Sequence, residues 1–460
     1  MMLTRRLPRW GVALFASMLI HGAASAQSAP SSAPAGLIQV YGDALKNNAA
    51  FRARLAQFEA INQVHEQARG QLLPQIGLRA TYDYVHEEIQ GQYFGIVDVD
   101  NEDDFDRSLI GVQLTQPLYR PELLISRDQA ELARTQARFQ LDTEEDALLL
   151  AVAETYFAVL SAQDLSAFAK AEREALARQL EQVQTRHAAG LVTDADLRAA
   201  ESQQANAEVG ALEAETGLQA AHATLELIAG KPYPRLKTLP EGMVLTRPEP
   251  ARMGDWVERA RTQSLAVLSA RVSTQIAALE VDKAHKLRWP KLDAAASAYR
   301  LESGGGLQGD REETEGRVGV QLSMPIYSGG SVSAAIAEAE ARRVAAEALF
   351  DAAVATSVRD AQLAFHQANN GMTRVPARRT ALDAARAAES ATAGGFDAGT
   401  RTTADVLRAI KERFEAEREY SAARYAFMLD SLRLKRAAGN LANADLIRFD
   451  RLLRVYESQP

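Results

Sequence analysis

Residues 111–119 read GVQLTQPLY, and residues 319–327 read GVQLSMPIY. A second pair of stretches matches at nearly the same spacing, because residues 190–193 (GLVT) correspond to residues 399–402 (GTRT). In both of these stretches an aspartate follows three residues after the last threonine. The matches predict that one unit of roughly two hundred residues occurs twice with almost constant internal lengths. A period this long indicates two equivalent halves of one architecture and argues against a solenoid of many short repeats.

The N-terminus has the pattern of an export signal. Three arginines precede or flank a short apolar run, residues 10–20, and residues 24–26 (ASA) fit a cleavage site. We therefore predict a signal peptide over residues 1–26 and a disordered spacer over residues 27–36. The apolar run is shorter than the about 20 residues that span a bilayer, and we expect no membrane-spanning helix later in the chain.

Composition excludes several classes of site. The chain has no cysteine, which rules out disulfides, thiolate metal sites, a cysteine nucleophile and lipid attachment at an N-terminal cysteine. The net charge is −8, from 52 basic and 60 acidic residues, and no long block of like charge suggests a nucleic-acid partner.

Four segments alternate between apolar and polar residues with a period of two, which is typical of two-faced strands. Their lengths match the about 9–11 residues of a tilted transmembrane strand, so we expect the apolar face to meet lipid and the polar face to meet water. The four predicted strands are residues 76–88, 107–118, 292–300 and 317–324.

Polar loops are expected between the two strands of each pair, over residues 89–106 and 302–315. The first of these contains Asp98, Asp100 and Glu102, a spacing that faintly resembles a calcium-binding loop. The required glycine and bidentate glutamate are missing from their positions, however. We interpret the stretch as a solvated loop and predict no metal site and no cofactor.

Long helical segments follow each strand pair. Residues 122–187 contain no glycine or proline, which predicts a rod of about 100 Å at 1.5 Å per residue. The second copy, residues 331–396, contains Gly371 and Pro376, and we expect a kink there. The remaining predicted helices are a first stretch over residues 37–72 and two returning helices over residues 193–228 and 402–438.

Four amphipathic strands cannot stand alone in a membrane, because the two outer strands would expose unpaired backbone groups to hydrocarbon. Two chains would give eight strands, whose barrel is filled by side chains, whereas three chains give twelve strands and leave a passage. The sequence therefore predicts an α+β membrane protein that forms a trimeric outer-membrane channel. The alternative, a periplasmic coiled-coil scaffold without channel activity, explains the rods and leaves the strands unexplained.

Two other classes fit poorly. An enzyme would need a catalytic or metal constellation, but the seven histidines share no metal-ligand spacing, and the chain has no GxSxG elbow or phosphate-binding loop. We predict no catalytic residues. The acidic run over residues 142–146 is interpreted as a solvated helix face. A general diffusion porin would not need rods of about 100 Å.

Several short stretches carry a resemblance to a known family. They are residues 190–192 with Asp196, residues 325–327 with Gly329 and Gly330, and residues 398–402 (AGTRT) with Asp405, Val406, Leu407, Tyr420 and Tyr425. From about residue 37 to residue 453 the chain resembles the TolC family of outer-membrane export channels. The resemblance implies a homotrimer with a twelve-stranded β-barrel, a twelve-helix periplasmic α-barrel and a collar at mid-height. It implies structural repeats over residues 37–230 and 255–439, with collar segments over residues 231–254 and 440–460.

The resemblance also implies partners and a gate. The partners are a periplasmic adaptor protein, an inner-membrane transporter that is either ABC-type or proton-driven, and outer-membrane lipid. Asp196 and Arg401 fall on a polar network that closes the periplasmic tip, and Asp405 falls on an acidic ring. Phe396 lacks the hydroxyl that would join the network, and Arg408 replaces a second ring aspartate. Arg408 is placed to pair with Asp405, which predicts weaker cation selectivity than a double acidic ring would give.

The two hairpin tips are expected to dock the adaptor. Gly190 and Gly399 are predicted to occupy the turns with a positive φ. The other expected docking positions are Leu191, Thr193, Thr400 and Thr402. The sequence does not identify the cargo, because drug efflux, metal efflux and type I secretion use similar ducts. The tip resembles the less specialised, TolC-like branch of the family and the chain has no N-terminal cysteine for a lipid, which favours type I secretion or use by several systems.

Overall fold

The computed structural model describes residues 33–93, 96–240, 242, 245–306 and 309–454, so the predicted signal peptide lies outside the described residues. Its elements follow one order twice: two helices, two strands and two long helices. The first series is α1 (Leu37–Asn47), α2 (Ala49–Gly70), β1 (Gln75–Tyr93), β2 (Val97–Tyr119), α3 (Pro121–Ala188) and α4 (Asp194–Ala229). The second is α5 (Met253–Gln263), α6 (Leu265–Lys286), β3 (Lys291–Gly304), β4 (Asp310–Ser323), α7 (Ser331–Asp397) and α8 (Thr403–Ala437), followed by α9 (Asn443–Leu452).

The first helical stretch is two helices, and the prediction of one continuous helix over residues 37–72 was wrong. Asn48 adopts an extended conformation between α1 and α2, and its side chain accepts a hydrogen bond from the Phe51 amide at 3.0 Å. Asparagine favours this cap because its side chain competes with the helix for backbone groups. Ser264 separates α5 from α6 at the equivalent place in the second series.

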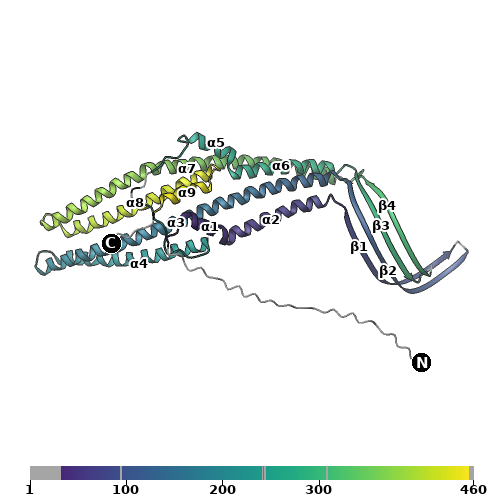
Figure 1. The fold of residues 1–460 in the computed structure, drawn as a ribbon, viewed down its shortest axis with the longest axis horizontal. Coiled ribbons are helices and arrows are strands. Elements are labelled where there is room, and N and C mark those ends of the chain that lie inside the picture. Colours follow the sequence, from purple (N-terminus) through teal and green to yellow (C-terminus); the bar gives the residue numbers. More distant parts are fainter. Residues whose placement is uncertain (1–32, 94–95, 241, 243–244, 307–308, 455–460) are drawn as a thin grey trace, which may run out of the picture.

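The four strands form one antiparallel sheet in the order β1-β2-β3-β4. Leu78 on β1 pairs with Val112 on β2, and Val112 pairs in turn with Ala298 on β3. The apolar residues of all four strands therefore share one face. This face is open, since Leu78 is 71% exposed and Val320 on β4 is 65% exposed. Figure 1 shows the sheet projecting beyond the ends of the helices.

The strands are longer than the sequence predicted, and most of the expected polar loops belong to them. β1 and β2 span 19 and 23 residues and stay paired as far as Tyr93 and Val97. An antiparallel ladder satisfies backbone groups whatever the side chains are, so the strands continue beyond their apolar segments. Asp98, Asp100 and Glu102, whose spacing faintly resembles a calcium-binding loop, lie on β2. The described residues include no group of carboxylates or histidines that could hold a metal ion.

The long helices confirm the predicted rods. α3 has 68 residues and α7 has 67. α7 continues through Gly371 and Pro376 without interruption, so the kink expected there stays a prediction. Gly371 has a different role, because a Cβ at this position would lie 2.6 Å from the ring of Phe427 on α8. The glycine therefore allows α7 and α8 to approach closely.

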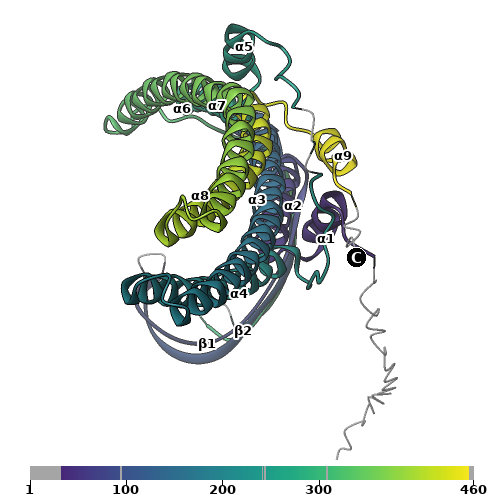
Figure 2. The same cartoon turned by 90° about the vertical axis from the view of Figure 1, so that its left-hand side faces the viewer.

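Seen along its length, the molecule is a curved wall of helices with α1, α5 and α9 on its convex side (Figure 2). Two glycines allow helices of this wall to meet end to end at mid-height. A Cβ on Gly230, after α4, would lie 2.4 Å from Asn47, and one on Gly439, after α8, would lie 2.3 Å from the carbonyl of Gln263. Both glycines have a positive φ, +77° and +70°. Thus α4 abuts the α1–α2 junction, and α8 abuts the α5–α6 junction.

The largest buried cluster lies at mid-height and joins α3 to α1, α4, α8, α9 and the collar segment that follows α4. Tyr156 on α3 is fully buried and donates a hydrogen bond to the Lys237 carbonyl at 2.7 Å. Contrary to the sequence prediction, one described helix, α3, is long and apolar enough to cross a membrane by composition. Half of the most apolar 18-residue stretch of α3 is buried, and residues of α3 from Leu148 to Leu160 belong to the core beneath the collar.

Candidate periplasmic gate

Both hairpin tips lie at the end of the molecule remote from the sheet (Figure 1). Gly190 and Gly399 each have a φ of +74°, as predicted. The amide of Leu191 donates to the Arg186 carbonyl at 2.9 Å, and the amide of Thr400 donates to the Gly395 carbonyl at 2.8 Å. These bonds close the ends of α3 and α7 around a glycine that adopts the left-handed conformation without strain. The two turns therefore have the same backbone geometry.

The returning helices also begin in the same way. The amide of Asp196 donates to the Thr193 hydroxyl at 3.2 Å, and the carboxylate of Asp196 accepts from the Thr193 amide at 3.1 Å. Thr402 and Asp405 repeat this capping box at 3.2 and 3.0 Å. Such a box satisfies two backbone donors that the first turn of a helix leaves free. Asp196 and Asp405 thus cap α4 and α8 within their own chain.

The electrostatics of the second tip follow from this cap. Hydrogen bonds from the Thr402 backbone and hydroxyl lower the pKa of Asp405, and the charges of Arg401 and Arg408 lower it further. Among the described residues, no ion pair joins Arg408 to Asp405 or Arg401 to Asp196 within one chain. Both arginines are exposed at the tip. Their contacts with a second copy of the chain stay a prediction.

The two hairpins are joined near their tips by Arg186, which the sequence analysis did not identify. Its guanidinium lies 4.0 Å from the centroid of the Phe396 ring and donates to the Phe396 carbonyl at 2.9 Å. The same side chain pairs with Asp397 at 3.1 Å. Phe396, which lacks the hydroxyl expected at this position, therefore contributes its ring face instead. No local pattern indicates this contact, because its partners are more than two hundred residues apart.

An apolar cluster that includes Phe396 packs between the two hairpins near the Arg186 contact. Phe396 is 3% exposed and Phe414 is fully buried. The remaining members come from both hairpins: Leu176, Val183, Ala200, Val406, Leu407 and Ile410. Further from the tip, carboxylates on α3 pair with arginines on α8, with Glu172–Arg418 at 2.8 Å and Glu154–Arg433 at 2.7 Å. The hairpins of one chain are thus joined along much of their length.

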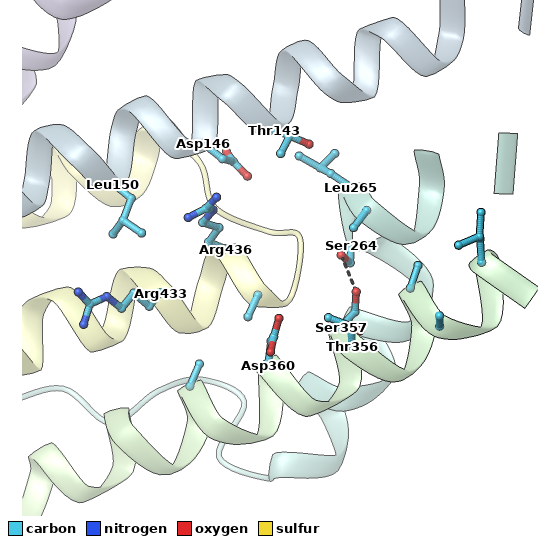
Figure 3. Close-up of a pocket in the computed structure, with 16 residues that line it drawn as sticks. Thr143, Asp146, Leu150, Ser264, Leu265, Thr356, Ser357, Asp360, Arg433 and Arg436 are labelled. Carbon is cyan, nitrogen blue, oxygen red and sulfur yellow. Dashed lines mark hydrogen bonds between the residues drawn. The ribbon is translucent and has the colours of Figure 1, made fainter. Parts of the chain in front are cut away.

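The end of α8 meets the start of α6 at mid-height of the wall. A cavity of about 650 Å³ lies there between α3 and α7 (Figure 3). Asp146 on α3 faces Arg436 on α8 across the cavity, and Ser357 on α7 donates to Ser264 at 3.2 Å. Burial raises the pKa of Asp146 to about 6. The positive charge of Arg436 opposes this rise, and the negative charges of Glu145 and Asp142 add to it.

Comparison with known proteins identifies the class of channel. A family model described as outer membrane efflux protein matches residues 40–231 and 256–440. The chain is 30% identical over 425 residues to outer membrane protein TolC of Vibrio cholerae, covering 91% of this chain and 94% of the relative. It is 28% identical over 421 residues to alkaline protease secretion protein AprF of Pseudomonas aeruginosa, covering 89% and 86%.

Solved structures agree on the fold. The outer membrane protein VceC of Vibrio cholerae matches with a TM-score of 0.72 at 19% identity, covering 88% of this chain and 96% of that chain. The CmeC outer membrane channel of Campylobacter jejuni matches with a TM-score of 0.74 at 13% identity, covering 96% and 97%.

The chain belongs to the outer membrane efflux protein family. It is an outer-membrane exit duct for type I secretion or efflux, with a long extension into the periplasm. The resemblance to the TolC family and the predicted channel fold are confirmed.

Arg186→Ala should raise single-channel conductance in planar bilayers. The cation–π contact and the partly exposed ion pair together contribute about 1–2 kcal/mol per chain to the link between the hairpins. Arg198→Ala is the matched control, because Arg198 lies near the same tip and its one ion pair among the described residues is with Glu201 of its own helix, at 2.8 Å. Equal conductance in both variants would exclude Arg186 from the gate.

Asp146→Asn should stabilise the protein at pH 8 and have little effect at pH 4.5. The pKa of Asp146 rises from 3.8 to about 6 on folding, so its contribution to stability is complete below about pH 4 and is lost as the pH rises through 6. Allowing for partial solvent screening, we expect a gain of about 1 kcal/mol at pH 8. Thermal unfolding followed by circular dichroism measures it. Asp360→Asn, on the opposite wall, is the control, and equal shifts in both variants would contradict the assignment.

Proposed function

We propose that three copies of this chain form a closed channel through the outer membrane. The observation that carries this proposal is the four-stranded sheet, whose apolar face is open and whose edges, β1 and β4, each have only one neighbour within the described chain. Unpaired edges are not tolerated in hydrocarbon, so each edge needs the opposite edge of another copy. Three copies give twelve strands, a barrel wide enough to leave a passage.

The curved helical wall supports the same assembly. Each copy supplies one arc, and three arcs close into a periplasmic tunnel below the barrel. We assign residues 1–26 to a signal peptide and residues 27–36 to a spacer. The two repeats are residues 37–230 and 255–439, and the collar takes residues 231–254 and 440–460. A periplasmic scaffold would leave the open apolar face of the sheet without a partner.

In this channel the hairpin tips form the gate and the docking site for a periplasmic adaptor. We assign the gate to Asp196, Phe396, Arg401, Asp405 and Arg408, with Arg186 as the contact that joins the hairpins. The docking positions are Gly190, Leu191, Thr193, Gly399, Thr400 and Thr402. Leu191 is 74% exposed, which suits an apolar contact with a partner. An inner-membrane transporter would supply the energy, and we assign this chain no catalytic role.

The substrate class is proposed from the relatives. Proteins named for protease secretion, AprF and PrtF, align over 89% and 92% of this chain. The cobalt-zinc-cadmium resistance protein CzcC aligns over 63% of it, at 26% identity. The longer alignments with the protease secretion proteins favour type I secretion or use by several transport systems over dedicated metal efflux.

Cross-linking between introduced cysteines tests the trimer. Because the chain has no cysteine of its own, only the introduced residues can react. Cysteines introduced at Leu78 on β1 and Val320 on β4 should be joined between chains by a bifunctional maleimide, giving trimers on a denaturing gel. The control places cysteines at Val112 and Ala298, which pair within one chain across β2 and β3, so it should give cross-linked monomers. Monomers alone from the edge pair would contradict the assembly.

Arg401→Ala and Asp196→Ala test the gate in planar bilayers. If the two side chains hold neighbouring copies together, each contact contributes about 1 kcal/mol, and three copies lost together shift the open–closed balance by roughly a hundredfold. Both variants should then raise conductance. Asp194→Ala is the control for Asp196, because Asp194 lies on the same turn and pairs with His187. Conductance equal to that of the parent would remove both residues from the gate.

A further inference from the structure

The end of α6 and the turn before β3 carry a concentrated positive charge. Residues 283–289 read KAHKLRW, and no acidic residue lies between Asp282 and Asp293. The equivalent segment of the first repeat, residues 67–73 (QARGQLL), contains only Arg69. Arg69 is already paired with Glu66 at 3.1 Å. The basic segment is thus a property of the second repeat alone.

The side chains of this segment form a basic and aromatic patch, defined here as Lys286, Arg288 and Trp289. The Lys286 Nζ lies 3.3 Å from the centroid of the Trp289 ring, and residue Trp289 is 44% exposed. Arg288 is exposed and donates to the Ser333 hydroxyl at 3.0 Å. Within the described chain neither cation pairs with a carboxylate. Both therefore have donors available for an external acceptor.

The patch lies at the end of α6, where Arg288 bonds to Ser333 on α7 and Lys286 projects from another side of the helix. Lys283 on α6 bonds to Gln129 of α3, whereas Val281 and Ala284 pack against α7. Residues advance by about 100° along a helix, so Lys286 projects from the side opposite Ala284. Trp289 lies beyond the end of α6, and its ring contacts Lys286. Because α6 lies between α3 and α7, the patch is not at an edge that a second copy would cover.

Its height places the patch at a membrane surface. β3 begins at Lys291, and the apolar face of the sheet starts with Leu292, which pairs with the 67% exposed Leu322 (Figure 1). The patch thus borders the periplasmic edge of the apolar band. Tryptophan and basic side chains favour this interface, where the ring meets acyl chains and the charge meets phosphates.

We propose that this patch binds the phosphate of an anionic phospholipid in the inner leaflet of the outer membrane. Lys286 and Arg288 donate to the phosphate oxygens, and Trp289 packs against the start of the acyl chains. The proposal rests on the proposed function, because it needs the sheet to span the membrane. Each basic residue near an anionic surface favours binding by roughly fivefold, so two of them give a headgroup preference of at least about tenfold.

Tryptophan fluorescence tests the proposal in the full-length mature channel. After removal of the predicted signal peptide the chain has two tryptophans, and Trp256 is 1% exposed and bonded to the Pro250 carbonyl at 2.7 Å. Trp289 is therefore the one that lipid can reach. The channel is reconstituted in phosphatidylcholine vesicles containing either brominated phosphatidylglycerol or brominated phosphatidylcholine. Trp289→Phe gives the background signal of Trp256.

We expect brominated phosphatidylglycerol to quench Trp289 at about one tenth of the mole fraction that brominated phosphatidylcholine requires. The Lys286→Gln/Arg288→Gln double variant should lose this preference and keep quenching by phosphatidylcholine. Arg69→Gln, the control in the first repeat, should keep the preference, and free inorganic phosphate should not compete.

Equal quenching by both lipids in the parent would overturn the headgroup preference. Absence of quenching by either lipid, in a protein that still cross-links as a trimer and conducts, would show that Trp289 faces the tunnel. That result would overturn this inference and leave the proposed function intact. Loss of cross-linking and of conductance in the parent would instead contradict the proposed function itself.

Discussion

The constraint on which the structure depends is the pairing of backbone groups at the edges of β1 and β4. Each unpaired amide or carbonyl costs several kcal/mol in hydrocarbon, and no side chain on the strands removes that cost. The described part of one chain supplies four strands with an open apolar face. The proposed trimer, the passage within it and the closure of three helical arcs into a tunnel all follow from satisfying these edges.

Duplication supplies the second principle of the architecture. At mid-height, Gly230 and Gly439 have the same role in the two repeats. Each lets the end of a returning helix contact the junction between the two helices that begin the same repeat. At the tips, the same glycine turn and the same threonine–aspartate cap occur twice. The two repeats therefore build the wall from equivalent joints, which explains why their internal lengths have stayed almost constant.

The two repeats differ in side-chain chemistry at three places. Arg186 of the first hairpin reaches Phe396 and Asp397 of the second, which makes the contact between hairpins asymmetric. The cavity at the α8–α6 junction holds Asp146, whose pKa is raised by burial. The patch of Lys286, Arg288 and Trp289 also occurs only in the second repeat. Equivalent backbones thus carry different chemistry at the tip, at mid-height and at the end of α6.

Local pattern alone determined much of this protein. The period-two alternation of residues 76–88 and 317–324 predicted two-faced strands, and the unbroken run of residues 122–187 predicted a rod that α3 confirms. Gly190 and Gly399 were placed at turns because few other residues adopt a positive φ without strain. These features follow from neighbours in the sequence, so the sequence is sufficient to find them.

Tertiary structure decided the rest. The strands extend through acidic residues because their backbones pair with each other, which side-chain polarity does not reveal. Asp196 caps its own helix through Thr193, and its contact with a second copy of the chain stays a prediction. The contact of Arg186 with Phe396 joins residues that only folding brings together. Contacts of this kind depend on where two long helices cross, and no local pattern records that position.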